Sequence, residues 1–421
     1  MRRLDPHRMW LLYRGGESLA SAIAWTLSGV YFVRDVHMSP LQLVLTGTAL
    51  EVGYFLFEVP TGVVADLYSR RASIVVGDLF MGACTIGIGL THSFAVIAAL
   101  SAVEGFGWTF KSGADDAWLA DEVGLENVGR AYQRGAQLGR IAGLLGIGAS
   151  VALGVADLRL PLIVGGAVWM GVAVMLALLM PERGFRRASS ADLGGVGRFA
   201  QTTADGARLI WARPILLMIV GITLFGGLWS EGVDRLWEAH LLRDVHVPGF
   251  ATLSPIVWFG VISAGATLLA IGIAQPLRKT FEHARPAGMA RALFVVDAVL
   301  VAGTLGFALA GSFTLALLAF WTISVARSVG GPVLSAWLNV NIDDSRVRAT
   351  VISMTNLGDS VGEWGGGPAL GAIGNVFGIR AALAAAGAAL SPALLLYGRA
   401  IKHHGREPEL EELPEAVQAG A

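Results

Sequence analysis

The sequence predicts an all-α integral membrane protein with twelve transmembrane helices in two pseudo-symmetric six-helix bundles. Its composition, the length of its apolar runs and an internal repeat predict this class. Of the 421 residues, 54% are hydrophobic and only 15% are charged, whereas soluble domains carry about 25% charged residues. The apolar residues form runs of about 20, a length that crosses a hydrocarbon core of roughly 30 Å.

Twelve segments satisfy this length requirement. The first six are 9–33, 40–65, 72–92, 94–119, 130–156 and 160–181. The second six are 213–241, 252–275, 288–310, 312–339, 347–375 and 378–400. The stretch between the two sets is polar, basic and rich in Gly and Ser. We therefore expect an N-terminal bundle (1–181), a cytoplasmic linker (182–212), a C-terminal bundle (213–400) and a charged, disordered tail (401–421).

Lys and Arg are distributed unevenly between the two sets of loops. One set holds Arg2, Arg3, Arg8, Arg70, Arg71, Arg183, Arg186, Arg187, Arg198, Arg208, Arg278, Lys279, Arg285, Arg346, Arg348, Lys402 and Arg406. The opposite set holds Arg34, Arg159, Arg243 and Arg380. Since cytoplasmic loops carry the excess of Lys and Arg, we expect a multi-pass protein of the cell (inner) membrane with both termini in the cytoplasm.

Short sequences recur in the two halves in the same order. Arg34-Asp35-Val36-His37 returns as Arg243-Asp244-Val245-His246, and Ala117-Trp118-Leu119 returns as Ala336-Trp337-Leu338. Arg130-Ala131 and Leu138-Gly139 recur as Arg348-Ala349 and Leu357-Gly358. Related halves around a central site are a common design of transporters.

The loop after the second predicted helix contains a Gly, an acid four residues later and paired basic residues. It reads Gly62-Val63-Val64-Ala65-Asp66-Leu67-Tyr68-Ser69-Arg70-Arg71. This segment resembles the cytoplasmic signature loop of the major facilitator superfamily, and the stretch 57–71 looks most like the drug-efflux branch of macrolide or tetracycline resistance. The resemblance covers the whole membrane region and implies that Gly62, Asp66, Arg70 and Arg71 form a gating loop that stabilises the outward-facing state. The alternative is that the arginines only set the topology.

Two segments depart from the pattern of this family. The fourth helix contains Ala102-Val103-Glu104-Gly105 where the family often has an Arg tied to proton coupling. The fifth contains glycines from Gly139 to Gly146 but lacks the Gly-Pro pair of the antiporter signature. The motifs therefore do not demonstrate proton antiport.

Several ionisable residues lie inside predicted spans, where they cost several kcal/mol unless they face a water-filled cavity or pair with each other. Candidates for proton coupling or the substrate cavity are Glu17, Glu51, Glu104, Asp115, Asp116, Arg140, Glu231, Asp234, Arg327 and Asp359. Glu104, Trp108, Lys111 and Asp115 follow helical spacing, which predicts one polar stripe. The alternative is ion pairing, for example of Lys111 with Asp115 or of Arg235 with Glu231 or Glu238. Glu17 and Glu51, read as having no basic neighbour one turn away, favour the cavity role.

Aromatic residues on the same helices are candidate substrate contacts: Trp25, Tyr54, Trp108 and Trp229. The alternative for each is packing against lipid or an interfacial belt. The run Gly365-Gly366-Gly367-Pro368 predicts either a hinge or close helix packing.

The sequence thus favours proton-driven export of a small amphiphilic or drug-like compound by alternating access. Uptake or facilitated diffusion of a small nutrient or metabolite, and lipid flipping, remain alternatives on the same fold. We expect a monomer that interacts with a small-molecule substrate, protons and the lipid bilayer. No cofactor, metal site or enzymatic residue set is expected, and a formal net charge of −1 argues against a nucleic-acid partner.

Overall fold

A computed structural model describes residues 3–185, 208, 210–245, 247–249, 254–274, 284–342 and 348–404. The regular structure of these residues is helical, which confirms the all-α fold. The N-terminal half contains α1 (Pro6–Trp25), α2 (Ser28–Arg34), α3 (Pro40–Leu67), α4 (Arg70–Gly89), α5 (Phe94–Thr109), α6 (Ala114–Val123), α7 (Leu125–Ala156) and α8 (Leu160–Leu179). The C-terminal half contains α10 (Pro214–His240), the π-helical turn η1 (Leu241–Val245), α11 (Val257–Leu269), the π-helical turn η2 (Ala270–Ala274), α13 (Pro286–Ala308), α14 (Phe313–Val340), α15 (Arg348–Phe377) and α16 (Ile379–His404).

Within this described part of the chain, 9 helical segments are long and apolar enough to cross a bilayer. The three other expected spans are also helical: α1 with α2, the short apolar α11 with η2, and α15. Most of the expected linker and the residues after 404 lie outside the described residues. At the C-terminus α16 continues to His404, four residues into the segment expected to be a disordered tail.

Side chains next to the helix starts explain where several helices begin. Ser39 and Gln42 form a reciprocal capping box at the start of α3, where Pro40 occupies the first turn. Ser69 accepts a hydrogen bond from the backbone N–H of Ala72 at the start of α4. These caps place the signature loop and the α2–α3 loop at defined positions.

Two of the expected helices are broken. The first ends at Trp25 and resumes at Ser28, and the hydroxyl of Thr26 donates to the carbonyl of Ala22 at 2.6 Å. Hydroxyl groups that bond back to carbonyls in this way often bend helices. The fourth expected helix breaks between α5 and α6, where Gly113 has a φ of 72°, a conformation that glycine adopts at little cost.

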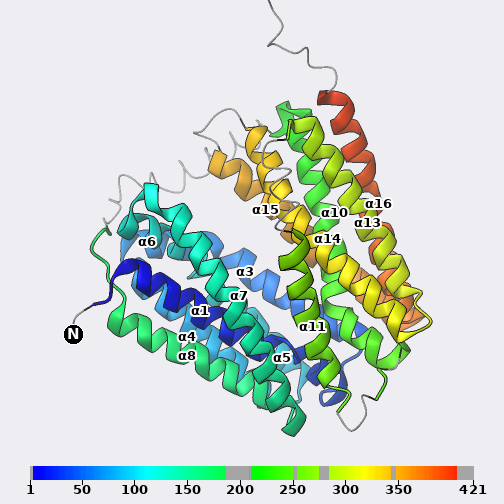
Figure 1. Cartoon of the computed structure of the whole chain (residues 1–421), viewed down its shortest axis with the longest axis horizontal. Helices are drawn as coiled ribbons and strands as arrows, with labels where there is room; N and C mark the ends of the chain where they lie inside the picture. Colours follow the sequence, from blue (N-terminus) through cyan, green and yellow to red (C-terminus); the bar gives the residue numbers. More distant parts are fainter. Residues whose placement is uncertain are drawn as a thin grey trace, which may run out of the picture.

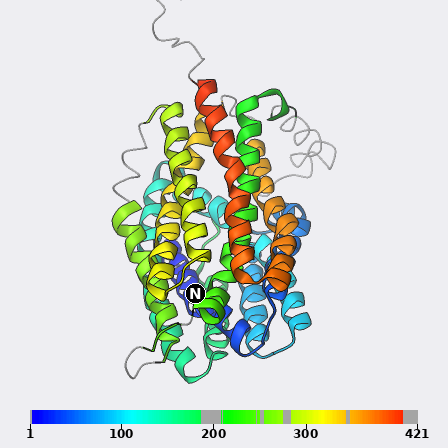
Figure 2. The ribbon, with the colours of Figure 1, turned by 90° about the vertical axis from the view of Figure 1, so that its right-hand side faces the viewer.

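The helices pack as two groups that follow the two halves of the chain (Figure 1). In the first half α1 packs on α7, α4 on α8 and α3 on α5; in the second, α10 packs on α15 and α16, and α13 on α14 and α16. Figure 2 shows α16 beside α10 and α13 in the second group. Contacts between the groups come mainly from α3 with α15 and α10, and from α7 with α11.

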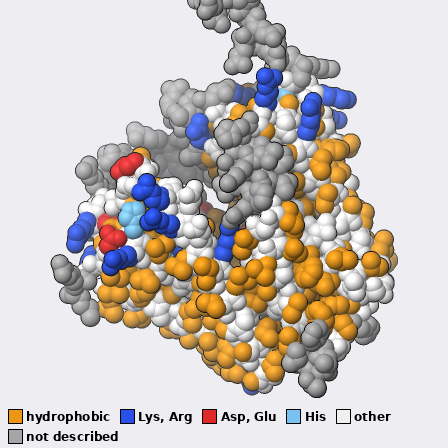
Figure 3. All heavy atoms as spheres, in the orientation of Figure 1, with side chains coloured by type: hydrophobic (Ala, Val, Ile, Leu, Met, Phe, Trp, Pro, Cys, Tyr) orange, Lys and Arg blue, Asp and Glu red, His pale blue; other side chains and the backbone are white. Residues whose placement is uncertain are grey.

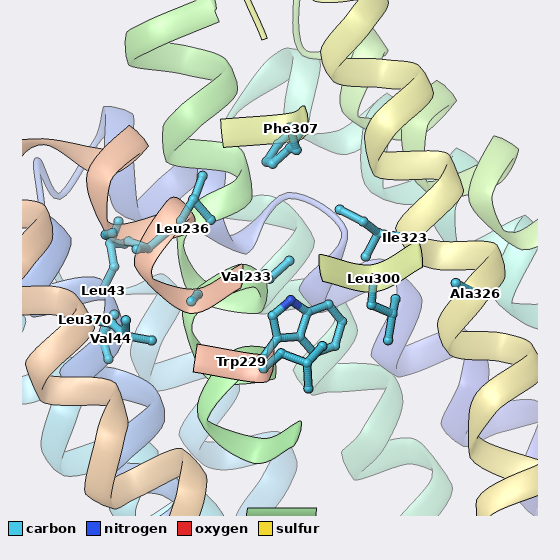
Figure 4. Packing of buried hydrophobic residues seen from close by; sticks show 14 of the residues in the cluster. Leu43, Val44, Trp229, Val233, Leu236, Leu300, Phe307, Ile323, Ala326 and Leu370 are labelled. Carbon is cyan, nitrogen blue, oxygen red and sulfur yellow. The ribbon is translucent and has the colours of Figure 1, made fainter. Parts of the chain in front are cut away.

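We call the end at which α1 begins and α16 finishes the terminal end, and the opposite end the far end. At the far end the halves are joined: Arg243 donates to the carbonyl of Met38 at 2.7 Å, and the backbone N–H of Leu41 donates to Asn375 at 3.0 Å. Figure 4 shows Leu43 and Val44 of α3 beside Leu370 of α15, which continues this contact into the interior.

Toward the terminal end the two groups of helices diverge (Figure 1). On the face drawn in Figure 3, Lys and Arg side chains gather near the terminal end, and hydrophobic side chains cover the rest of both halves. The structure is therefore closed at the far end, and its apolar surface matches a protein embedded in lipid.

Candidate functional site

The C-terminal half contains a cavity of about 360 Å³ between α10, α13, α14, α15 and α16. Its polar lining consists of Thr223, Ser230, Asp297, Arg327, Ser335, Thr355, Asn356, Asp359, Glu363 and Tyr397. Trp229, Leu293, Val296, Leu300 and Leu334 are among its apolar lining residues. A concave, mainly apolar space with a few convergent polar groups is the usual form of a small-molecule site.

The positive charge of the cavity belongs to Arg327 on α14 and is already balanced. Its two terminal nitrogens contact the two carboxylate oxygens of Asp234 on α10 at 2.5 and 3.0 Å. Its guanidinium carbon lies 5.2 Å from the ring centre of Trp229, within the range of a cation–π interaction. The indole N–H of Trp229 donates to Thr304 at 2.8 Å and so fixes the ring; Figure 4 shows this ring near Leu300.

Three further carboxyl groups line the same cavity, and none lies within ion-pair distance of a basic side chain among the described residues. Asp297 on α13 is 8% exposed and hydrogen-bonded to Tyr397. Glu363 accepts a hydrogen bond from Ser230 at 3.3 Å, and Asp359 lies one turn before it on α15. None of the three forms an ion pair with another described residue, so the fully ionised cavity would carry an excess of negative charge.

A second charged group lies where α3 meets the C-terminal half. Arg235 donates to Glu231 at 3.2 Å on α10, which confirms the predicted pair at i, i+4. Glu51 on α3 lies within hydrogen-bonding reach of Ser360 and Glu363 on α15. A Cβ on Gly47 would lie 2.0 Å from Glu231 and 2.2 Å from Arg235. Only a residue without a side chain lets α3 approach this ion pair so closely.

The N-terminal half holds a buried charge network around Lys111. Its Nζ atom contacts the carboxylate of Asp78 at 2.6 Å and also that of Glu17. Arg14 contacts Glu17 at 2.9 Å and Asp115 at 3.9 Å. Asp78 is fully buried and Lys111 is 4% exposed, so Lys111 is paired from both sides inside the protein.

This network corrects two sequence predictions. Lys111 does not pair with Asp115, because the break between α5 and α6 turns the two side chains apart and the acids on α1 and α4 are closer. Glu17 does have a basic neighbour one turn away, Arg14, and so is not an isolated acid. The i, i+3 spacing of Arg14 and Glu17 in the sequence is typical of such a pair.

The expected polar stripe on the fourth helix is also wrong. Glu104 is 1% exposed and points into the N-terminal half, where Thr85 of α4 donates to it at 2.9 Å. Trp108, in contrast, is 47% exposed, and its ring centre lies 5.4 Å from Lys111. Glu104 and Trp108 thus lie in different environments although both belong to α5, and the helix breaks after Thr109, before Lys111 and Asp115.

The signature loop makes its described contacts within the N-terminal half and with the first residues after it, Glu182 and Phe185. Arg70 contacts Asp66 at 3.5 Å, the carbonyl of Ala117 at 2.9 Å and the carboxylate of Asp121 on α6. Arg71 donates to the carbonyl of Met180 at 3.4 Å. Asp66 is 48% exposed as a side chain, and a Cβ on Gly62 would meet nothing within 4 Å.

Four other candidate site residues lie outside the C-terminal cavity and the network around Lys111. Asp116 accepts a hydrogen bond from Tyr132 at 2.6 Å near the terminal end. Arg140 is exposed in the middle of α7 and forms no ion pair with a described residue. Trp25 is partly buried against the core, and the hydroxyl of Tyr54 lies 3.5 Å from that of Ser112.

The glycine run of α15 serves close packing. A Cβ on Gly366 would lie 2.0 Å from Leu228, and one on Gly367 would lie 2.9 Å from Glu231 and 3.0 Å from Val44 of the other half. The helix continues through Pro368 from Arg348 to Phe377. His37 lies in the α2–α3 loop with a φ of 58°, and His246 lies outside the described residues.

Asp78 and Asp297 were not predicted as site residues from the sequence. Each is an acid within a predicted apolar span, 72–92 and 288–310, and thus met the criterion that singled out the other charges. Neither belongs to a motif or has a charged neighbour on its own helix that would have drawn attention to it.

Comparison with known proteins identifies the architecture. The profile of the Major Facilitator Superfamily matches residues 15–366. The uncharacterized MFS-type transporter YxaM of Bacillus subtilis (strain 168) is 22% identical over 358 residues, which are 85% of this chain and 86% of the relative.

Solved structures share the fold at low sequence identity. The nucleoside transporter NupG superimposes with a TM-score of 0.74 and 11% identity, over 95% of this chain and 100% of the other. A bacterial homologue of the human lysosomal transporter Spinster, in an inward-facing and unoccupied conformation, gives 0.72 and 17% over 94% and 96%. The human organic anion transporter MFSD10 (TETRAN) gives 0.60 and 17% over 94% and 100%.

Proposed function

The chain belongs to the major facilitator superfamily, and from this premise we propose that it is a proton-coupled exporter of a small cationic amphiphile. Like the relatives with which it shares its family and fold, it is a multi-pass membrane transporter. It is not an enzyme. A small-molecule substrate is consistent with that family. The substrate class, direction and coupling are the steps that we propose.

The excess of acids in the C-terminal cavity is the observation that carries the proposal. Asp297, Asp359 and Glu363 line the cavity, and the charge of Arg327 is already matched by Asp234. An uncompensated carboxylate in a low-dielectric site is costly. Its charge can be balanced either by a proton or by a cationic substrate. If the two compete for the same carboxyl groups, release of one accompanies binding of the other, which is the requirement for antiport.

The rings around the cavity suit the same ligand. Trp229 already holds Arg327 over its face, and such a face attracts organic cations as well. A volume of about 360 Å³ lies at the lower end of the range for small-molecule pockets, roughly 300–1,000 Å³. We therefore propose a quaternary ammonium or protonated amine with an apolar part.

The closed far end determines from which side the cavity is accessible in this conformation. We propose that the basic terminal end is cytoplasmic by the positive-inside rule, so that the cavity loads from the cytoplasm in this conformation. The contacts at Met38 and Leu41 would then open in the other state. Asp66 contacts its own half here, and we propose that the signature loop engages the C-terminal half only after the terminal end has closed.

Uptake or facilitated diffusion remains the second candidate function. It is favoured by the fold shared with a nucleoside transporter and by the absence of the Gly-Pro pair between Gly139 and Gly146. A neutral solute would leave the cavity carboxyl groups protonated throughout the cycle. The two candidates therefore differ in whether substrate movement displaces protons.

Purified protein in liposomes with an internal pH dye separates these candidates. We expect hexyltrimethylammonium, whose charge is independent of pH, to cause proton movement, and Asp297→Asn or Asp359→Asn to reduce it at least tenfold. Asp157→Asn, in the loop between α7 and α8 and outside the cavity, is the matched control and should retain the response at a temperature at which it is folded. Uridine serves as the neutral probe. Movement of uridine without proton flux, together with no response to the cation, would refute the proposal.

A further inference from the structure

The lipid-facing side of the C-terminal half has an apolar groove of about 500 Å³. It lies over α14, between α11 with η2 on one side and α13 on the other. Its walls include Leu269, Ile273, Val295, Val299, Leu318 and Val325. Several of these side chains are exposed, for example Val295 at 59% and Leu318 at 53%. Trp321 also lines the groove, and its N–H donates to the carbonyl of Ile262 at 3.0 Å.

The groove and the acidic cavity lie on opposite sides of the α13–α14 seam and share one residue. Val296 lines both spaces, and Asp297, the next residue, lines the cavity alone. Opposite Val296, α14 presents Gly330 and Gly331. A Cβ on Gly330 would lie 3.0 Å from Val296, and one on Gly331 would meet nothing within 4 Å. The side chain of Val296 against a glycine therefore separates the two spaces at this level.

We infer that the seam at Val296 is a lateral passage, through which a cationic amphiphile keeps its charged head in the acidic cavity and its hydrocarbon tail in the apolar groove. This inference rests on the proposed function and adds to it a binding mode and a route from the bilayer. The head would lie beside Asp297, and a chain leaving it would pass Val296 directly. The groove contains little that could bind a polar group, since Thr322 already donates to the carbonyl of Leu318 at 2.8 Å.

The glycines of α14 explain how a chain could pass between packed helices. A methylene chain needs a gap of one side chain, and rotation or displacement of Val296 away from Gly330 would provide it without breaking a hydrogen bond. A bulky residue at either position would close the gap from one side. The passage thus depends on Val296 and Gly330. Neither forms a hydrogen bond or ion pair with the charged groups of the cavity among the interactions described above.

The passage predicts a dependence of affinity on tail length. Each buried methylene contributes about 0.8 kcal/mol, which is roughly a fourfold change in Kd. We would measure equilibrium binding of alkyltrimethylammonium ions, from methyl to octyl, to the full chain in lipid nanodiscs. Each value is corrected for partition into protein-free nanodiscs. We expect the Kd to fall about fourfold per methylene until the groove is filled.

Variants at the seam test the route. Val296→Trp and, from the opposite helix, Gly330→Val should flatten the dependence on tail length. Each slope is measured relative to tetramethylammonium in the same variant, so that a change in the cavity itself cancels. Leu315→Trp, at a position on α14 that is 58% exposed and outside the groove, is the control and should retain the slope. Thermal unfolding checks that each variant is folded, and the two seam variants are independent in case one is not.

The outcomes separate this inference from the proposed function. If tetramethylammonium binds but the wild type shows no slope, or if both seam variants retain the slope, the lateral passage is refuted and the cation site stands. The same holds if a phospholipid acyl chain occupies the groove permanently, because the slope is then flat in every variant. If no member of the series binds, the proposed function fails and the passage with it.

Discussion

Gly371 on α15 lies at the contact that closes the far end, and alanine at this position should shift the protein toward the opposite state. A Cβ there would lie 2.9 Å from the Cα of Leu41, 3.1 Å from its Cδ1 and 3.2 Å from the Cβ of Val44, all on α3. Carbon atoms pack at about 3.5–4.0 Å, so α3 would have to withdraw by roughly 0.5–1 Å. Because one of the atoms belongs to the backbone, a change of rotamer cannot relieve the overlap.

The cost of this overlap applies only while α3 and α15 touch. Overpacking costs about 1–3 kcal/mol, and about 1.4 kcal/mol changes an equilibrium tenfold. The ratio of far-end-closed to far-end-open molecules should therefore fall by roughly 5-fold to 150-fold. This range is large enough to change the dominant conformation if the two states differ by only a few kcal/mol.

Distances between spin labels at the far end measure that ratio. Cysteines replace Leu90 after α4 and Leu309 after α13, which are 66% and 69% exposed, in a background in which Cys84 is replaced by Ser. We expect Gly371→Ala to add or increase a long-distance population. Gly365→Ala, on the same helix but with nothing within 4 Å of its Cβ, is the matched control. Identical distance distributions in the two variants would refute the reasoning.

Three further predictions concern the other charged groups. Lys111→Met leaves Asp78 buried without its partner and should destabilise the protein by about 3–5 kcal/mol. Thermal unfolding should show partial recovery of stability when Asp78→Asn is added. An unchanged stability of Lys111→Met would contradict the buried pairing. Asp66→Asn should leave the unfolding temperature unchanged, since this side chain is half exposed. It should slow transport in liposomes, because it weakens a contact of the signature loop worth about 1–3 kcal/mol in the state closed at the terminal end. An unchanged transport rate would contradict the gating role. Hydrogen bonds from the side chain and backbone of Arg159 lower the pKa of Asp157 to about 2, whereas the pKa of Asp in the unfolded chain is about 3.9. The ionised Asp157 therefore contributes fully to stability above about pH 4, and this contribution is lost as the pH falls toward about 2. Asp157→Asn should therefore lower the unfolding temperature equally at about pH 7 and about pH 5, and a difference between these values would contradict this pKa.

The helices were largely predictable because the bilayer imposes a length on each apolar run. The span expected at 40–65 is α3, Pro40–Leu67, and the span expected at 288–310 is α13, Pro286–Ala308. The breaks at Thr26 and Gly113 were not predictable in the same way. Hydropathy averages over about 20 residues, whereas a hydroxyl bonded to a carbonyl or a glycine with positive φ acts within one turn.

For the charges, local pairs could be predicted and remote pairs could not. Arg235 with Glu231 follows from helical spacing, and the structure confirms it. Lys111 with Asp78 joins two helices whose mutual rotation no periodicity in one chain reveals. The sequence also could not show that Asp234 would be matched by Arg327, 93 positions away. The composition of the cavity thus depends on packing between helices rather than on any local pattern.

The two halves repeat each other in sequence but differ in how they balance charge. In the N-terminal half, the acids Glu17 and Asp78 share Lys111, and Arg14 lies close to Glu17. A ligand ion would have to displace a tethered cation there. In the C-terminal half, the cation Arg327 is already paired, and the carboxyl groups around it lack a basic partner among the described residues. A mobile cation or proton can bind there without displacing an existing partner. This comparison of two charge clusters favours the C-terminal cavity, rather than the network around Lys111, as the place of the proposed charge exchange.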